Sequence, residues 1–188
     1  MKEAEALKLF RTSGALQSGH FKLSSGLHSA QYMQCALVLQ YPEYAGKLCA
    51  ALAAKFKDDN PTVVVAPAIG GIVVSCGVGR ALGARSIFTE REDGRVKFRR
   101  GFSVNKQDRV LVVEDVVTTG KSTREVLEAV ESAGASVVGI GALVDRSNGT
   151  AFKENYASLI RIDIPAFKPE ECPLCKEGKP IVKPGSRA

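Results

Sequence analysis

Residues 110–123 read V-L-V-V-E-D-V-V-T-T-G-K-S-T, and this stretch decides the fold class of the chain. Its first four residues are apolar and mostly β-branched, which is typical of a strand buried on both faces. Two carboxylates follow, and then a short turn of hydroxyl residues and glycine. Ser122 and Thr123 are favoured N-cap residues, and the apolar spacing that starts at Val126 predicts a helix after them. The stretch therefore predicts a buried strand, a turn and a helix N-terminus.

The turn has the composition of an anion-binding site. Backbone N–H groups at a helix N-terminus point toward a bound anion, and the helix dipole favours negative charge there. The hydroxyls of Thr118, Thr119 and Ser122 add further donors. Glu114 and Asp115 would face the same crevice and accept hydrogen bonds from a ribose diol. The pattern therefore favours a ligand with one phosphate and one diol.

Two other interpretations of the turn were weighed. A Walker A loop needs glycine five residues before Gly-Lys-Ser, and Asp115 occupies that position. A nucleoside triphosphate would also meet two carboxylates where its own negative charge should lie. An ordinary turn with a solvated acidic pair is the second interpretation, and it is disfavoured because adjacent carboxylates directly after four apolar residues are costly unless they are used.

Strands and helices alternate along the chain. Helices are expected at residues 2–11, 43–57, 72–82 and 123–133, and strands at residues 63–66, 86–89, 110–113 and 137–143. This alternation predicts a parallel sheet with helices on both faces. The turns at residues 67–71, 114–122 and 145–146 should then meet at the carboxyl ends of the strands, where such sheets bind ligands.

Residues 90–109 form a long basic connection between two of these strands. Seven lysines and arginines against four acidic residues leave a charge of +3, half of the net +6 of the chain. A connection of this length is typical of a lid or a binding loop, and alternating apolar residues within it predict a hairpin. A polyanionic substrate is favoured over nucleic acid as its partner, because few aromatic residues lie among the cations.

Residues 110–123 resemble the signature of the type I phosphoribosyltransferases: an apolar strand, two acidic residues, two apolar residues and Thr-Thr-Gly. Within that family, three further segments resemble the orotate phosphoribosyltransferases. They are F-K-L-S-S-G-L-H-S at residues 21–29, A-P-A-I-G-G at residues 66–71 and L-V-D-R at residues 143–146. Many relatives carry lysine at the positions of Ser24 and Gly70, so this chain lacks two cationic ligands. The alternative for residues 67–71 is an ordinary glycine-tolerant turn.

The resemblance implies an α/β, type I phosphoribosyltransferase-like fold: a mostly parallel central sheet flanked by helices, with a flexible loop and a small amino-terminal hood. It implies a single domain over residues 1–188, with hood and tail elements at residues 1–40 and 165–188. The implied reaction transfers the phosphoribosyl group of phosphoribosyl pyrophosphate to orotate in pyrimidine biosynthesis. The implied enzyme is a cytoplasmic homodimer that uses Mg²⁺. A purine-type phosphoribosyltransferase and a nucleic-acid-binding regulator of the same fold remain alternatives.

The resemblance also implies the roles of individual residues. Arg91 and Asp115 are the expected catalytic residues, with Arg91, together with Lys97, acting on pyrophosphate in the partner subunit. Thr118 and Arg146 are the expected orotate ligands, since a guanidinium can form a forked pair with the carboxylate that uracil lacks. The alternative for Arg146 is a surface pair with Asp145. No direct metal ligand is expected. The residues expected to bind phosphoribosyl pyrophosphate are Glu114, Asp115, Val116, Val117, Thr118, Thr119, Gly120, Lys121 and Ser122.

Composition limits the remaining classes. The chain has 188 residues, of which 45% are hydrophobic, and its longest apolar stretch is interrupted by proline and glycine, so no membrane span is expected. Charged residues within residues 1–10 indicate the start of an amphipathic helix rather than a signal peptide. Five cysteines indicate reduced thiols. Cys172 and Cys175 form a Cys-x-x-Cys pair, but His20 and His28 are expected to lie far from it. A structural or surface-turn role is therefore favoured, with a zinc bridge between subunits as the alternative.

Overall fold

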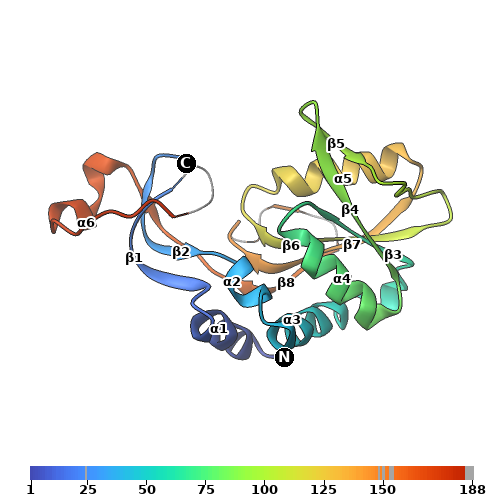
Figure 1. The fold of residues 1–188 in the computed structure, drawn as a ribbon, viewed down its shortest axis with the longest axis horizontal. Helices are drawn as coiled ribbons and strands as arrows, with labels where there is room; N and C mark the ends of the chain where they lie inside the picture. The colour runs from blue at the N-terminus through green and yellow to red at the C-terminus, as the bar shows by residue number, and fades with distance from the viewer. Residues whose placement is uncertain (24, 148, 150, 153–154, 185–188) are drawn as a thin grey trace.

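The computed structural model describes residues 1–23, 25–147, 149, 151–152 and 155–184, and it contains two sheets (Figure 1). Ser24, one of the two positions that depart from the family pattern, lies outside the described residues. The helices are α1 (Glu3–Thr12), α2 (Ala36–Leu39), α3 (Pro42–Ala53), α4 (Gly71–Leu82), α5 (Lys121–Ser132) and α6 (Pro173–Lys176), with 3-10 turns η1 (Lys57–Asp59) and η2 (Pro169–Glu171). The strands are β1 (Leu16–Lys22), β2 (His28–Met33), β3 (Val63–Pro67), β4 (Arg85–Glu92), β5 (Arg95–Phe98), β6 (Arg109–Val117), β7 (Ser136–Asp145), β8 (Tyr156–Arg161) and β9 (Ala166–Phe167).

The larger sheet has six strands in the order β5-β4-β3-β6-β7-β8. Neighbouring strands are parallel except for β5, which pairs antiparallel with β4 at one edge. Helices α3 and α4 cover one face and α5 covers the other (Figure 1). Alternate residues of β3 enter different cores: Val64 packs with Leu52 of α3, while Val65 packs with Val126 of α5. The expected α/β fold with a mostly parallel central sheet is confirmed.

Two expected boundaries at the central motif are wrong. Strand β6 continues to Val117 rather than ending at residue 113, because it pairs with β7 as far as Val117 opposite Asp145. Helix α5 begins directly after Gly120, which has a φ of 74° and makes no side-chain cap. Thr123 is buried inside the helix. Ser122 and Thr123 therefore do not cap the helix; the conformation of Gly120 starts it, and Thr119 Oγ1 accepts a hydrogen bond from the Lys121 N–H at 3.3 Å.

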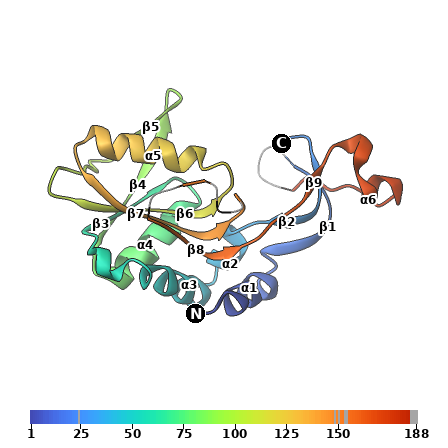
Figure 2. The ribbon, with the colours of Figure 1, turned by 180° about the vertical axis from the view of Figure 1, so that it is seen from behind.

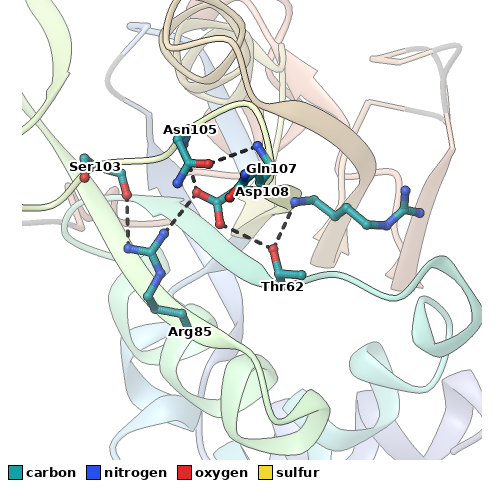
Figure 3. A network of polar contacts seen from close by, with 7 residues as sticks. Thr62, Arg85, Ser103, Asn105, Gln107 and Asp108 are labelled. Carbon is teal, nitrogen blue, oxygen red and sulfur yellow. Dashed lines mark hydrogen bonds and ion pairs between the residues drawn. The ribbon is translucent and has the colours of Figure 1, made fainter.

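The predicted hairpin within residues 90–109 is confirmed as β4 and β5, and the chain that follows β5 is anchored at its far end (Figure 3). The carboxylate of Asp108 accepts hydrogen bonds from the Asn105 N–H at 2.9 Å and from Arg85 Nη2 at 3.2 Å. Arg85 also donates to the Ser103 carbonyl at 3.1 Å. Arg85 begins β4, so these contacts hold the connection at the amino ends of the strands and leave the hairpin turn at the opposite edge.

The smaller sheet has the order β1-β2-β9 and lies beside the larger one (Figures 1 and 2). We call β1, β2 and residues 165–184 the small lobe. The chain returns along β1, where Val182 N donates to the His20 carbonyl and Lys22 N donates to the Val182 carbonyl, both at 2.8 Å. Segments from the two ends of the chain thus form one unit. Among the described residues, no helix has the length and apolar character that crossing a bilayer requires.

Candidate active site

The three predicted turns converge at the carboxyl ends of β3, β6 and β7. Arg146 N donates to the Val117 carbonyl at 2.8 Å, which joins the ends of β7 and β6. On the other side, the turn after β3 approaches β6 so closely that a Cβ at Gly70 would lie 2.6 Å from Asp115 Oδ2. A lysine at position 70 would therefore require Asp115 to move. Glycine at position 70 therefore serves more than the conformation of the turn: without a Cβ, the backbone of the turn can lie close to the acidic pair.

Glu114 and Asp115 form the floor of this crevice on β6. Asp115 N donates to Glu114 Oε1 at 3.3 Å, and Val116 N donates to Asp115 Oδ1 at 2.9 Å. Burial raises the pKa of Glu114 well above its ordinary value, and the neighbouring negative charge of Asp115 raises it further. Burial also raises the pKa of Asp115. Among the described residues neither carboxylate has an ion-pair partner, so both remain available to hydroxyls or to a cation.

The turn after β6 is held from beneath by Arg124, a residue that the sequence analysis missed. Its guanidinium donates to the Thr119 carbonyl at 2.6 Å and to the Ala151 carbonyl at 3.0 Å, and it lies 5.4 Å from the centre of the Phe152 ring. The backbone of Gly120 lies against the same groups, and a Cβ there would be 2.9 Å from Phe152 Cζ. The sequence did contain a signal for Arg124: it is a cation near the N-terminus of a predicted helix, where the helix dipole disfavours positive charge.

Arg146 projects from the end of β7 into the same region. Its side chain is half-buried, and its Nε is buried with no hydrogen-bond partner among the described residues. Burial lowers the pKa of this guanidinium, whereas the nearby Cys35 and Tyr32 raise it. A buried donor without a partner is costly, and an anionic ligand would satisfy it.

The alternative of a surface pair between Asp145 and Arg146 is wrong. Asp145 is fully buried, and its Oδ1 accepts hydrogen bonds from the Ser147 N–H at 2.7 Å and hydroxyl at 2.6 Å. Its Oδ2 forms an ion pair at 3.5 Å with Arg161 of β8. Asp145 therefore holds Ser147 and Arg161, and Arg146 has no ion-pair partner among the described residues.

Cys35, at the start of α2, is a second contact that the sequence analysis did not foresee. Its thiol donates to the Asp115 carbonyl at 3.8 Å and is buried. Burial raises the pKa of the Cys35 thiol well above its ordinary value, and the negative charges of Asp115 and Glu114 raise it further. The thiol therefore stays protonated, and it supports the backbone of β6 rather than acting as a nucleophile.

Arg91 is not brought to the acidic pair in this structure. It lies on β4, forms an ion pair with Glu125 of α5 and donates to the Gly94 carbonyl at 2.6 Å. Lys97 is likewise engaged, with Glu92 at 3.0 Å. The Arg91–Glu125 pair holds the hairpin against α5, and the Lys97–Glu92 pair joins the two strands of the hairpin. The structure thus gathers Glu114, Asp115, the turn at residues 118–122 and Arg146, and it keeps the hairpin cations apart from them.

Comparison with known proteins places this crevice in a class. A family model described as a phosphoribosyl transferase domain matches residues 40–172. The chain belongs to the phosphoribosyltransferase family, and the matched region contains the strand, acidic pair and turn of residues 110–123.

Full-length relatives identify the branch of the family. Orotate phosphoribosyltransferase from Chlorobaculum parvum is 54% identical over 189 residues, covering 100% of this chain and 98% of the relative. The enzyme of the same name from Pelotomaculum thermopropionicum is 53% identical and covers 100% of this chain and 99% of its own length. A crystal structure of Mycobacterium tuberculosis orotate phosphoribosyltransferase with inorganic phosphate superimposes with a TM-score of 0.70 at 25% identity, covering 85% of this chain and 95% of that one. Within the family, the chain is placed with the orotate phosphoribosyltransferases.

Proposed function

We propose that the protein transfers the phosphoribosyl group of phosphoribosyl pyrophosphate to orotate, releasing pyrophosphate and orotidine 5′-monophosphate, in pyrimidine biosynthesis. The observation that carries the proposal is the half-buried guanidinium of Arg146, whose Nε has no hydrogen-bond partner in the part of the chain that the structure describes. It lies at the end of β7, beside the turn of β6. A planar guanidinium matches the planar carboxylate of orotate, which uracil and the purine bases lack.

The donor is proposed to lie along β6 and its turn. The backbone N–H groups and hydroxyls of residues 118–122 would hold the 5-phosphate, because they lie at the N-terminus of α5. Glu114 and Asp115 would accept hydrogen bonds from the ribose hydroxyls. Thr118, exposed between the two substrates, would contact orotate. The full set of proposed donor-binding residues is Glu114, Asp115, Val116, Val117, Thr118, Thr119, Gly120, Lys121 and Ser122.

The acidic pair fits a role beside Mg²⁺. Glu114 and Asp115 are two nearly buried carboxylates that lack an ion-pair partner among the described residues, and oxygen donors of this kind suit Mg²⁺. Because Mg²⁺ keeps several waters and binds phosphate oxygens, we propose that the substrate and not a protein cage supplies most of its ligands. When bound, the ion neutralises negative charge on the pyrophosphate.

In the proposed reaction, a ring nitrogen of orotate loses its proton to solvent and forms a bond to the anomeric carbon, while the bond from that carbon to the pyrophosphate oxygen breaks. The electron pair of the broken bond leaves with pyrophosphate, and the sugar carbon gains positive character that the Asp115 carboxylate stabilises. Arg91 would assist the departing pyrophosphate of a partner subunit in a homodimer, and this requires it to leave Glu125. We propose that this enzyme acts in the cytoplasm, without a nucleic acid or membrane partner.

A base panel tests the proposal. Pyrophosphate release is measured with phosphoribosyl pyrophosphate, Mg²⁺ and each of orotate, uracil, adenine and xanthine. Orotate alone is expected to support turnover. Turnover with a purine would instead assign a purine-type enzyme. No release with any base, together with salt-dependent binding of RNA or DNA, would favour the nucleic-acid-binding regulator.

A further inference from the structure

The small lobe gathers four potential metal ligands from the two ends of the chain. His20 lies on β1, His28 begins β2, and Cys172 and Cys175 lie at the start and within α6. One ligand atom of each residue lies within 4.8 Å of the other three. The expectation that His20 and His28 lie far from the Cys-x-x-Cys pair is therefore wrong. Three of the four residues are buried, and only Cys175 is exposed.

We propose that these four residues bind one zinc ion in a closed, structural site. Zinc–sulfur bonds of about 2.3 Å and zinc–nitrogen bonds of about 2.0–2.1 Å in a tetrahedron separate two nitrogens by about 3.3 Å and a nitrogen from a sulfur by about 3.6 Å. His20 Nε2 lies 3.2 Å from His28 Nδ1, 3.5 Å from Cys172 Sγ and 3.7 Å from Cys175 Sγ. His28 Nδ1 lies 3.2 Å from Cys175 Sγ. These four separations lie within about 0.4 Å of the values for a zinc tetrahedron, and the two remaining pairs of ligand atoms lie within 4.8 Å.

Hydrogen bonding alone does not account for this arrangement. Three groups, one nitrogen and two sulfurs, converge on the single Nε2 atom of His20. One ring nitrogen makes one good hydrogen bond, as donor or acceptor. Four ligand atoms around a common centre are what a metal ion requires, and two thiolates with two imidazoles in a tetrahedron are typical of zinc.

The second nitrogen of His20 supports the assignment. His20 Nδ1 lies 2.9 Å from the Lys179 carbonyl oxygen, so this nitrogen carries the proton and donates. The tautomer then leaves a lone pair on Nε2, the atom that faces the other three ligands. Metal-bound histidines commonly hold a carbonyl or carboxylate in this way, which sets both the ring orientation and its basicity.

The lobe has a structural need for such a site. Within the small lobe, only the paired residues Leu16 and Met33 at one end of β1 and β2 join a hydrophobic cluster, and none of the other described residues in 17–32 and 165–184 does. Its third strand, β9, has two residues, and α6 has four. Units of this size without a core commonly depend on a metal or on disulfides. Zinc would therefore join β1, β2 and the returning tail where hydrophobic packing does not.

All four ligands belong to one chain, so the site needs no second subunit. A zinc bridge between subunits, weighed from the sequence, is replaced by an intrachain site. With four protein ligands it has no open position for substrate, so its role is structural. Strand β2 runs from His28 to Met33, and its Tyr32 lies near Arg146. Loss of zinc is thus expected to loosen the lobe and, through β2, the neighbourhood of Arg146.

The experiment measures metal content directly. The full chain is purified with a thiol reductant, incubated with Zn²⁺, passed over a desalting column and analysed by plasma mass spectrometry. Cys175→Ser is compared with Cys76→Ser, because both cysteines are exposed and serine leaves no buried cavity at either site. One zinc per chain is expected in the wild type and in Cys76→Ser, and substoichiometric zinc in Cys175→Ser.

A second measurement uses the wild type alone, so that the proposal can still be tested if Cys175→Ser fails to fold. In the wild type, cobalt replacing zinc is expected to give the strong visible bands of a tetrahedral ion and a thiolate charge-transfer band. Chelation is expected to lower Tm, and added Zn²⁺ should restore it. A wild type that holds no stoichiometric zinc after incubation, or that holds it equally well as Cys175→Ser, would overturn the proposal. Neither measurement depends on pyrophosphate release, so the zinc site and the proposed reaction are tested separately.

Discussion

Replacing Arg146 by lysine is expected to weaken orotate binding and to spare the donor. No described residue accepts a hydrogen bond from Arg146 Nε, and a guanidinium can offer two parallel N–H groups to one carboxylate. Lysine keeps the charge and loses the fork. A charge-assisted hydrogen bond contributes about 1.5–3 kcal/mol. Since about 1.4 kcal/mol corresponds to a tenfold change, the KM for orotate should rise about 10- to 150-fold.

The assay is steady-state pyrophosphate release, with orotate varied at saturating donor and the donor varied at saturating orotate. Arg109→Lys is the matched control, because Arg109 donates to the carbonyls of Asp59 and Asn60 at the opposite end of β6. It should leave both KM values unchanged. An unchanged KM for orotate in Arg146→Lys, or an equal rise in both KM values, would refute the reasoning.

Asp115→Asn is expected to raise the KM for phosphoribosyl pyrophosphate, because a charge-assisted hydrogen bond of about 1.5–3 kcal/mol to the ribose is lost. Calorimetry should show nearly unchanged orotate binding. Equal losses for both substrates would count against the assignment of Asp115 to the ribose. Glu114→Gln should raise the free energy of unfolding at neutral pH, because burial raises the pKa of Glu114 in the folded state and its ionisation opposes folding. That gain should disappear below the ordinary glutamate pKa of about 4.3, and urea unfolding at pH 7 and pH 4 that gives the same difference would contradict it. Mixing Arg91→Ala subunits with Asp115→Asn subunits should restore activity, towards half of the activity of a wild-type dimer per heterodimer. The reason is that one active site of the heterodimer then carries both substitutions and the other carries neither. If heterodimers form and activity stays absent, Arg91 does not act in trans.

The local chemistry of the site could be predicted from the sequence. The apolar run of residues 110–113, the acidic pair after it and the turn before an amphipathic helix are patterns within one short stretch, so neighbouring residues alone indicate them. The alternation of strands and helices likewise predicted the parallel sheet and the edge where the turns meet.

Boundaries and partners depended on contacts between distant segments. Strand β6 extends to Val117 because β7 supplies hydrogen bonds there, and residues 114–117 alone do not reveal that ladder. Arg91 was predicted from its position along the chain, but only the packing of the hairpin on α5 pairs it with Glu125. Arg124 supports the turn because the loop after β7 brings Ala151 to it.

The zinc cluster shows the same division between sequence and structure. Cys-x-x-Cys is visible in the sequence as half of a site, and its local spacing carries no information about the other half. His28 and Cys175 are 147 residues apart, and they meet because β9 pairs with β2 and the tail returns along β1. Short-range patterns therefore determined the class of protein and the crevice at the carboxyl ends of β3, β6 and β7. Long-range strand pairing decided which charges face one another and where the four ligands converge.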